Sequence, residues 1–171
     1  MKTQTRSSAA TSINSARLPK VYSRFHFEPG TIVLDYGCGR YTDHIMKHLA
    51  GQLCAGYFPF DPYNQSAYAN AKALVDFETL AAETDLPAVV VCSNVLNVID
   101  SEDALQAVAE ELLRFVKYYG ARALVTVYEG DRSGRGRETG PDQWQRNERL
   151  PEYLRLFGSR ARIHKNTIVI E

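Results

Sequence analysis

The chain has 171 residues, of which 44% are hydrophobic, and its 20 basic and 20 acidic side chains give a formal net charge of zero. This length is typical of one domain with a sizeable core, and the neutral charge excludes a general electrostatic attraction to nucleic acid or to anionic membranes. No apolar segment approaches the ~20 residues that span a bilayer, and the three cysteines lack ligand spacing, so we expect a cytoplasmic protein with no membrane and no metal site.

Residues 1–12 are rich in Ser, Thr and Ala and lack the apolar stretch of a signal peptide, which predicts a disordered tail. Residues 13–171 contain no internal repeat and no linker, so we expect a single domain. Its first part, residues 15–27, is expected to form a short helix or turn whose aromatic side chains pack on a sheet.

The most informative stretch is 31–40, a β-branched strand that ends in Asp35 and then turns through Gly37 and Gly39. Glycine has no Cβ and accepts positive φ, so a nucleotide-like ligand can approach the bare backbone of such a turn. A dinucleotide motif would need a third glycine where this chain has Thr42. Asp35 would repel phosphate and pair with a cation, which favours a ligand that carries an amine and no phosphate.

The sequence from Asp35 to Gly39 resembles the first motif of the class I S-adenosylmethionine-dependent methyltransferases, Asp/Glu-x-Gly-x-Gly. The resemblance implies a three-layer, doubly wound α/β fold whose mostly parallel sheet ends in a C-terminal antiparallel hairpin. It also implies that Gly37, Cys38 and Gly39 admit S-adenosyl-L-methionine while Asp35 orients its amino-acid end. The alternative is a glycine-rich turn of the kind that is common in unrelated α/β proteins.

Residues 55–62 predict a second strand that ends at Asp61, where a doubly wound fold places the acid that binds a ribose diol. The alternative for Asp61 is an Asp-Pro turn that only ends the strand, and Pro59 suggests that the strand is short or bulged. Residues 72–77 are expected to form a short third strand. Its last acid, Asp76, then contacts the adenine amine according to the resemblance.

Residues 87–99 begin as a continuous apolar run, which predicts a buried parallel strand, and become polar at Ser93 and Asn94. This stretch resembles the fourth motif of the small-molecule methyltransferases, with Asn97 in place of a frequent histidine. The resemblance implies that Ser93 contacts the cofactor, that Ser93 and Asn94 line the path of the methyl group, and that Asn97 faces the substrate. The alternative for both asparagines is helix entry and loop hydrogen bonding.

The rest of the predicted scaffold comes from regular patterns. Residues 101–119 form an amphipathic helix with Ser101 as its N-cap and Gly120 as its terminator. A strand over residues 123–129 follows, and residues 161–171 are expected to form two short strands joined by a tight turn.

Residues 129–147, between the last parallel strand and the C-terminal part, are rich in glycine and arginine. This composition predicts a mobile loop that acts as a substrate lid at the ligand edge of the sheet. Arg132 and Arg135 can clamp a phosphate or carboxylate, while Trp144 and Arg146 can stack on and hydrogen-bond a planar group. The alternative is a disordered loop in which Trp144 anchors the following segment to the core.

These features together predict an S-adenosyl-L-methionine-dependent methyltransferase that acts on an unidentified small-molecule or macromolecular acceptor. No residue stands out as a general base. Three alternatives remain open: an enzyme that degrades the same cofactor, a nucleic-acid methyltransferase, and a non-catalytic cofactor-binding protein. Neutral charge and the lack of an Asn/Asp-Pro-Pro-Tyr sequence disfavour the nucleic-acid substrate.

Overall fold

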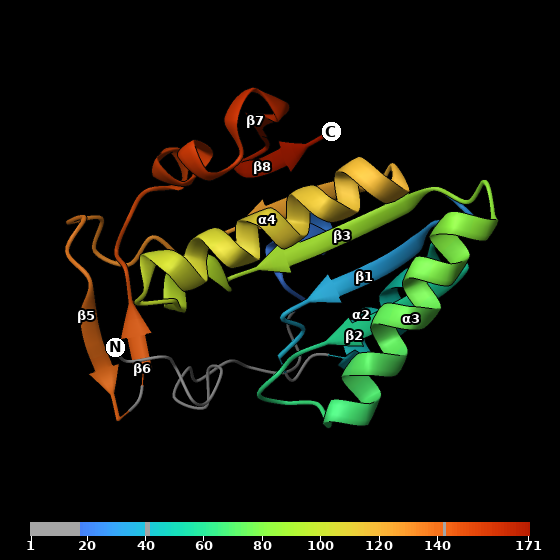
Figure 1. The fold of residues 1–171 in the computed structure, drawn as a ribbon, viewed down its shortest axis with the longest axis horizontal. Helices are drawn as coiled ribbons and strands as arrows, with labels where there is room; N and C mark the ends of the chain where they lie inside the picture. The colour runs from blue at the N-terminus through green and yellow to red at the C-terminus, as the bar shows by residue number, and fades with distance from the viewer. Residues whose placement is uncertain (1–17, 40–41, 142) are drawn as a thin grey trace.

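The computed structural model describes residues 18–39, 42–141 and 143–171, so the expected tail at 1–12 lies outside the described residues. Helices and strands alternate through most of the chain (Figure 1). The elements up to the last parallel strand are α1 Lys20–Arg24, β1 Ile32–Tyr36, α2 Thr42–Gly51, β2 Gly56–Phe60, α3 Ala67–Glu83, β3 Ala88–Ser93, the 3-10 turn η1 Leu96–Val98, α4 Glu102–Tyr119 and β4 Arg122–Thr126.

The remaining elements are shorter and include two antiparallel hairpins. They are β5 Arg137–Gly140, β6 Gln143–Gln145, the 3-10 segments η2 Leu150–Leu156 and η3 Gly158–Arg160, β7 Ala161–His164 and β8 Thr167–Ile170.

Six strands form one sheet in the order β2-β1-β3-β4-β8-β7. The first four are parallel, whereas β8 runs antiparallel to β4 and β7 antiparallel to β8. The expected α/β architecture with a mostly parallel sheet and a C-terminal antiparallel hairpin is therefore confirmed. Strand order reverses at β1, which lies between β2 and β3, and in open α/β sheets ligands bind at the carboxyl ends of the strands beside such a reversal.

The predicted strand at residues 72–77 is wrong, because this segment lies inside α3. The side chain of Ser66 caps the first turn of the helix, and Asn70, Ala73 and Phe77 recur at helical spacing on its buried side. A short apolar run has the same appearance in a buried helix and in a strand, and here the cap and the three- and four-residue spacing indicate the helix.

Pro59 does not shorten or bulge β2, which pairs with β1 in continuous register. Phe60 accepts backbone hydrogen bonds from Gly37 and Cys38 on the β1 side. Since consecutive residues of a strand direct their backbone groups to opposite sides, Pro59 faces the outer side of β2, which lies at the end of the sheet. Proline is tolerated there because it removes no hydrogen bond from the ladder.

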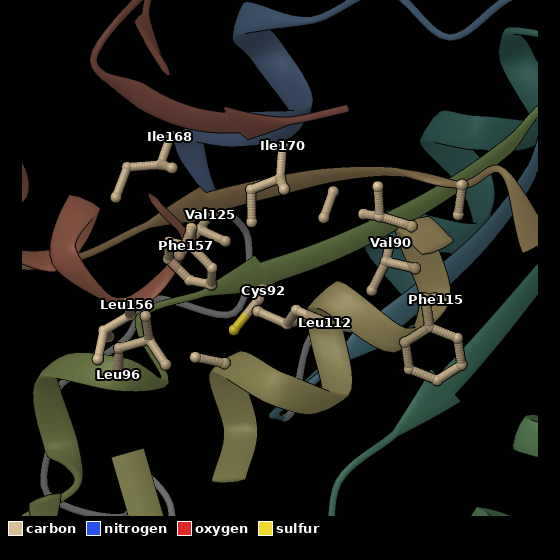
Figure 2. Packing of buried hydrophobic residues seen from close by; sticks show 14 of the residues in the cluster. Val90, Cys92, Leu96, Leu112, Phe115, Val125, Leu156, Phe157, Ile168 and Ile170 are labelled. Carbon is tan, nitrogen blue, oxygen red and sulfur yellow. The ribbon is translucent and has the colours of Figure 1, made fainter. Parts of the chain in front are cut away.

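Helices cover both faces of the sheet, as expected of a three-layer fold. Ile32 and Leu34 of β1 point to the face covered by α3 and α4, and Val33 between them points to the face covered by α1 and α2. Figure 2 shows the larger of these two cores, in which sheet residues pack against α4, η1 and η2. Its labelled members are Val90, Cys92, Leu96, Leu112, Phe115, Val125, Leu156, Phe157, Ile168 and Ile170.

The expected ends of α4 and of the C-terminal hairpin are confirmed. Ser101 Oγ accepts a hydrogen bond from the backbone N–H of Ala104, and the helix ends at Gly120. Lys165 and Asn166 both have positive φ, as a two-residue type I′ turn requires, and they join β7 to β8.

The segment at 129–147, expected to be a mobile loop, contains the hairpin β5–β6, which extends past the carboxyl ends of β1 and β3 (Figure 1). Its β6 strand contacts η1, the turn that follows β3.

Within the described ranges, no helix has the length and apolar character needed to cross a bilayer.

Candidate functional site

The glycine turn after β1 is bonded to the end of β2. Gly37 and Gly39 both have positive φ. The backbone N–H groups of Gly37 and Cys38 donate to the Phe60 carbonyl at 2.7 and 3.1 Å, and that of Gly39 donates to Asp61 Oδ2 at 2.9 Å. The sequence motif thus produces a turn whose amides close onto β2.

Asp61 lies beside the glycine turn, as predicted, and its side chain is only 2% exposed. Its carboxylate accepts four hydrogen bonds, from the backbone N–H groups of Gly39, Tyr63 and Asn64 and from the side-chain amide of Asn64. A carboxylate has about four acceptor positions, so these donors occupy them all. A sugar diol can bond to Asp61 only by replacing one of these donors, and Asn64 Nδ2 is the one that a side-chain rotation removes.

Asp35 at the end of β1 is also 2% exposed and lies on the α1 and α2 face of the sheet. Tyr57 donates its hydroxyl to Asp35 Oδ2 at 3.0 Å. The hydroxyl of Tyr22 is buried next to the same carboxyl but has no hydrogen bond of ordinary geometry. Burial raises the pKa of Asp35 to about 7, against the opposing effect of the two tyrosine hydroxyls. Near neutral pH this carboxyl can therefore exist in either protonation state.

A side chain covers the glycine turn at Gly37. A Cβ added to Gly37 would lie 2.2 Å from Val95 Cγ2, so Val95 occupies the space that the missing side chain leaves. Val95 directly precedes η1, and Asn94 before it has positive φ and is exposed. A ligand that touches the Gly37 backbone therefore requires Val95 to change its position.

Ser93 and Asn94 lie at the carboxyl end of β3, as predicted. Ser93 Oγ lies 3.0 Å from Oγ1 of Thr126 on the neighbouring strand, and the Asn94 N–H donates to the Thr126 carbonyl at 2.8 Å. Thr126 was not identified from the sequence, although its place at the end of a predicted strand parallel to β3 is the signal that could have found it. These groups line the same edge of the sheet as the glycine turn.

The placement of Asp76 at a strand end is wrong because no strand forms there. Asp76 lies in α3 and forms an ion pair with Lys72, one helical turn earlier, at 2.5 Å. Both side chains are substantially exposed. Pairs of this kind at i and i+4 are common on solvated helix faces, so the structure gives Asp76 no place at the carboxyl edge of the sheet.

Asn97 is buried and joins η1 to the β5–β6 segment. Its Nδ2 donates to Gln145 Oε1 at 3.2 Å, its Oδ1 accepts from the N–H of Tyr128 at 3.4 Å, and its carbonyl accepts from the N–H of Arg146 at 2.8 Å. The expected alternative, loop hydrogen bonding, describes Asn97 better than a side chain free to face a substrate.

Arg146 was predicted to bind substrate, but its side chain is only 8% exposed and holds the base of the hairpin. Its guanidinium forms ion pairs with Glu102, the first residue of α4, and with Glu148, and it donates to the Ile99 carbonyl at 3.0 Å. Burial raises the pKa of Glu102, but the hydrogen bonds and charges of Arg146 and Arg155 outweigh this effect and lower it. The ion pairs and the hydrogen bond of Arg146 thus connect the end of β6 to the start of α4.

Trp144 lies on the backbone of Gly136 within the same hairpin segment. A Cβ at Gly136 would be 2.3 Å from Trp144 Cζ2, which explains the glycine at this position. This contact lies within the hairpin segment and is not among the roles that the sequence predicted for Trp144.

Replacing Gly136 with alanine is expected to displace the Trp144 ring, at a cost of about 1–3 kcal/mol for an overpacked contact. Because the chain has a single tryptophan, its fluorescence emission reports the displacement directly. Gly51→Ala is the matched control, since an added Cβ there meets nothing within 4 Å. An unchanged emission spectrum in Gly136→Ala would contradict the contact.

Arg132 and Arg135 are exposed, and Arg132 Nε pairs with Glu129 Oε2 at 2.7 Å. A cleft of about 490 Å³ lies between residues 132–134 and residues 148–155, which include most of η2. The sequence analysis missed the η2 side of this cleft, namely Glu148, Arg149, Glu152 and Arg155. Their alternating charge around Pro151 is the signal that could have found them.

Among the described residues, no cluster of metal-ligating side chains is present.

No protein-family model, curated protein or solved structure matches this chain.

Proposed function

We propose that this protein binds S-adenosyl-L-methionine at the carboxyl end of β1 and transfers its methyl group to an acceptor. The observation that carries the proposal is the meeting of Asp35, the glycine turn and Asp61 at the point where the strand order reverses. The sheet order also supports it. Strand β8 lies antiparallel between β4 and β7, and a C-terminal antiparallel hairpin of this kind is what the resemblance to class I methyltransferases implies.

The residues fit such a ligand in two places and obstruct it in a third. The buried Tyr22 hydroxyl next to Asp35, which makes no hydrogen bond of ordinary geometry, is a polar group where an amino-acid end can bind. At Asp61, two sugar hydroxyls can take over the position of the Asn64 amide. At Gly37, Val95 has to rotate away before the ligand can touch the backbone.

A sulfonium bound here would supply an already activated methyl group: its carbon–sulfur electrons would stay on a neutral thioether that needs no proton, and the acceptor would release its proton to bulk solvent after the transfer. The protein then has to position the acceptor and exclude solvent. Asp61 holds the sugar and Asp35 the ammonium, while Ser93 and Thr126 line the edge beside them. Asp35 has to be ionised to attract the ammonium. Because burial raises its pKa to about 7, affinity should increase as the pH rises through that value.

Calorimetry with S-adenosylmethionine and S-adenosylhomocysteine tests the proposal, with Asp61→Asn and Asn64→Ala as a matched pair. Asp61→Asn is expected to lose more than about tenfold in affinity, or ~1.4 kcal/mol, because charged hydrogen bonds to a diol are lost. Asn64→Ala frees one acceptor position of Asp61 and is expected to bind as tightly as wild type or more tightly. Thermal unfolding of both variants controls for damage to the turn.

Absence of binding to wild-type protein would refute the proposal, and so would equal losses in the two variants. If the ligand binds, incubation with S-adenosylmethionine alone, followed by product analysis, separates methyl transfer from degradation of the cofactor. Binding without turnover in either assay would indicate a non-catalytic binding protein.

A further inference from the structure

The cleft beside η2 is lined by three arginines, one of which has no side-chain partner among the described residues. Three arginines and two glutamates line it, and two of the arginines pair with carboxylates outside the lining, Arg132 with Glu129 at 2.7 Å and Arg155 with Glu102 at 3.4 Å. Glu148 pairs with Arg146 at 3.2 Å and lies 3.7 Å from Arg155, so its charge is already compensated within the protein. The side chain of Arg149 is exposed and has no ion pair or hydrogen bond in the part of the chain that the structure describes.

The arginines come from two separate segments that face each other across the cleft. Arg132 follows the carboxyl end of β4 and uses Nε to bind Glu129, which leaves other guanidinium N–H groups for a ligand. Arg149 precedes the first residue of η2, Glu152 lies in its first turn and Arg155 in its last turn. A guanidinium presents a planar fork that matches phosphate and carboxylate oxygens in bidentate geometry.

We propose that this cleft binds a small molecule with two or more phosphate or carboxylate groups, with Arg149 as the principal contact. Its volume of about 490 Å³ lies within the range of small-molecule sites, about 300–1,000 Å³. Since residues 132–134 lie in the segment after the carboxyl end of β4, the cleft lies beyond the same edge of the sheet as the glycine turn. If the proposed function holds, the cleft selects acceptors that carry such anionic groups. Anion binding itself does not depend on that function.

Calorimetric titration at low ionic strength with inorganic pyrophosphate and, separately, with citrate tests the proposal. Arg149→Gln is expected to weaken binding about tenfold, since a charged hydrogen bond is lost. Glu152→Gln removes a negative charge from the cleft and is expected to strengthen binding about twofold. Arg160→Gln removes the same charge from an exposed site in η3, outside the cleft, and is expected to leave the affinity unchanged.

Binding of pyrophosphate alone would assign a phosphate ligand, and binding of citrate alone a carboxylate ligand. The proposal is overturned if neither anion binds, or if Arg160→Gln loses as much affinity as Arg149→Gln, because general surface charge then explains the result. Arg149→Gln should bind S-adenosylhomocysteine like wild type. A chain that binds anions in the cleft but not the nucleoside would refute only the proposed function.

Discussion

Asp35→Asn is expected to make the protein more stable than wild type at pH 8, by on the order of 2–4 kcal/mol, and to make little difference at pH 4. The folded chain holds this carboxyl in a buried site that raises its pKa from 3.8 to about 7. The folded state therefore binds the proton more tightly than the unfolded state. The stabilisation that the protonated Asp35 carboxyl contributes is complete below about pH 4. It is lost as the pH rises through 7, where the buried carboxyl must carry a charge.

Urea denaturation of wild type and Asp35→Asn at several pH values between 4 and 8 measures this effect. The amide can still accept the hydrogen bond from Tyr57, so the variant keeps the local contact. Asp85→Asn removes an exposed carboxyl and serves as the control. If Asp35→Asn shows the same loss of stability with rising pH as wild type, this carboxyl does not cause it. A variant that is more stable but binds the proposed cofactor more weakly would show that the buried charge serves binding.

Arg146→Ala is expected to destabilise the protein by about 2–4 kcal/mol, because Glu148 and the Ile99 carbonyl lose their buried partner. Hydrogen exchange should increase most in residues 143–147, since the guanidinium fastens β6 to the start of α4. Arg146→Lys retains the charge without the planar fork, so its stability should lie between those of wild type and Arg146→Ala.

Arg135→Ala is the control for this experiment, since it removes an exposed arginine of the same segment and should change stability by less than about 0.5 kcal/mol. Unchanged stability in Arg146→Ala, together with a loss of ligand affinity, would support the original prediction that Arg146 binds substrate.

The sequence predicted those parts of the fold that depend on local patterns. The strands β1, β3 and β4 are continuous apolar runs, and α4 combines helical periodicity with a serine cap and a terminal glycine. The segment at 72–77 was assigned incorrectly because a short apolar run does not distinguish strand from helix. The signals that indicate a helix extend outside that window, namely the capping residue Ser66 and the helical spacing that begins at Asn70.

The candidate site was predictable to the level of residue placement but not of contacts. Asp35, Gly39 and Asp61 meet because a doubly wound sheet brings the ends of β1 and β2 together. Arg146 finds its partner Glu102 at a separation of 44 residues along the chain, which no spacing rule reveals. The position of Val95 over Gly37 is likewise hidden from the sequence, since only the folded chain brings the residue before η1 to the glycine turn.

Because β2 lies at the end of the sheet and Pro59 faces outward from it, the outer edge of that strand lacks one amide donor. An extended segment from another molecule that approached this side would find a gap in the row of hydrogen bonds. The same residue that the pairing with β1 tolerates thus discourages edge-to-edge association at the β2 end of the sheet.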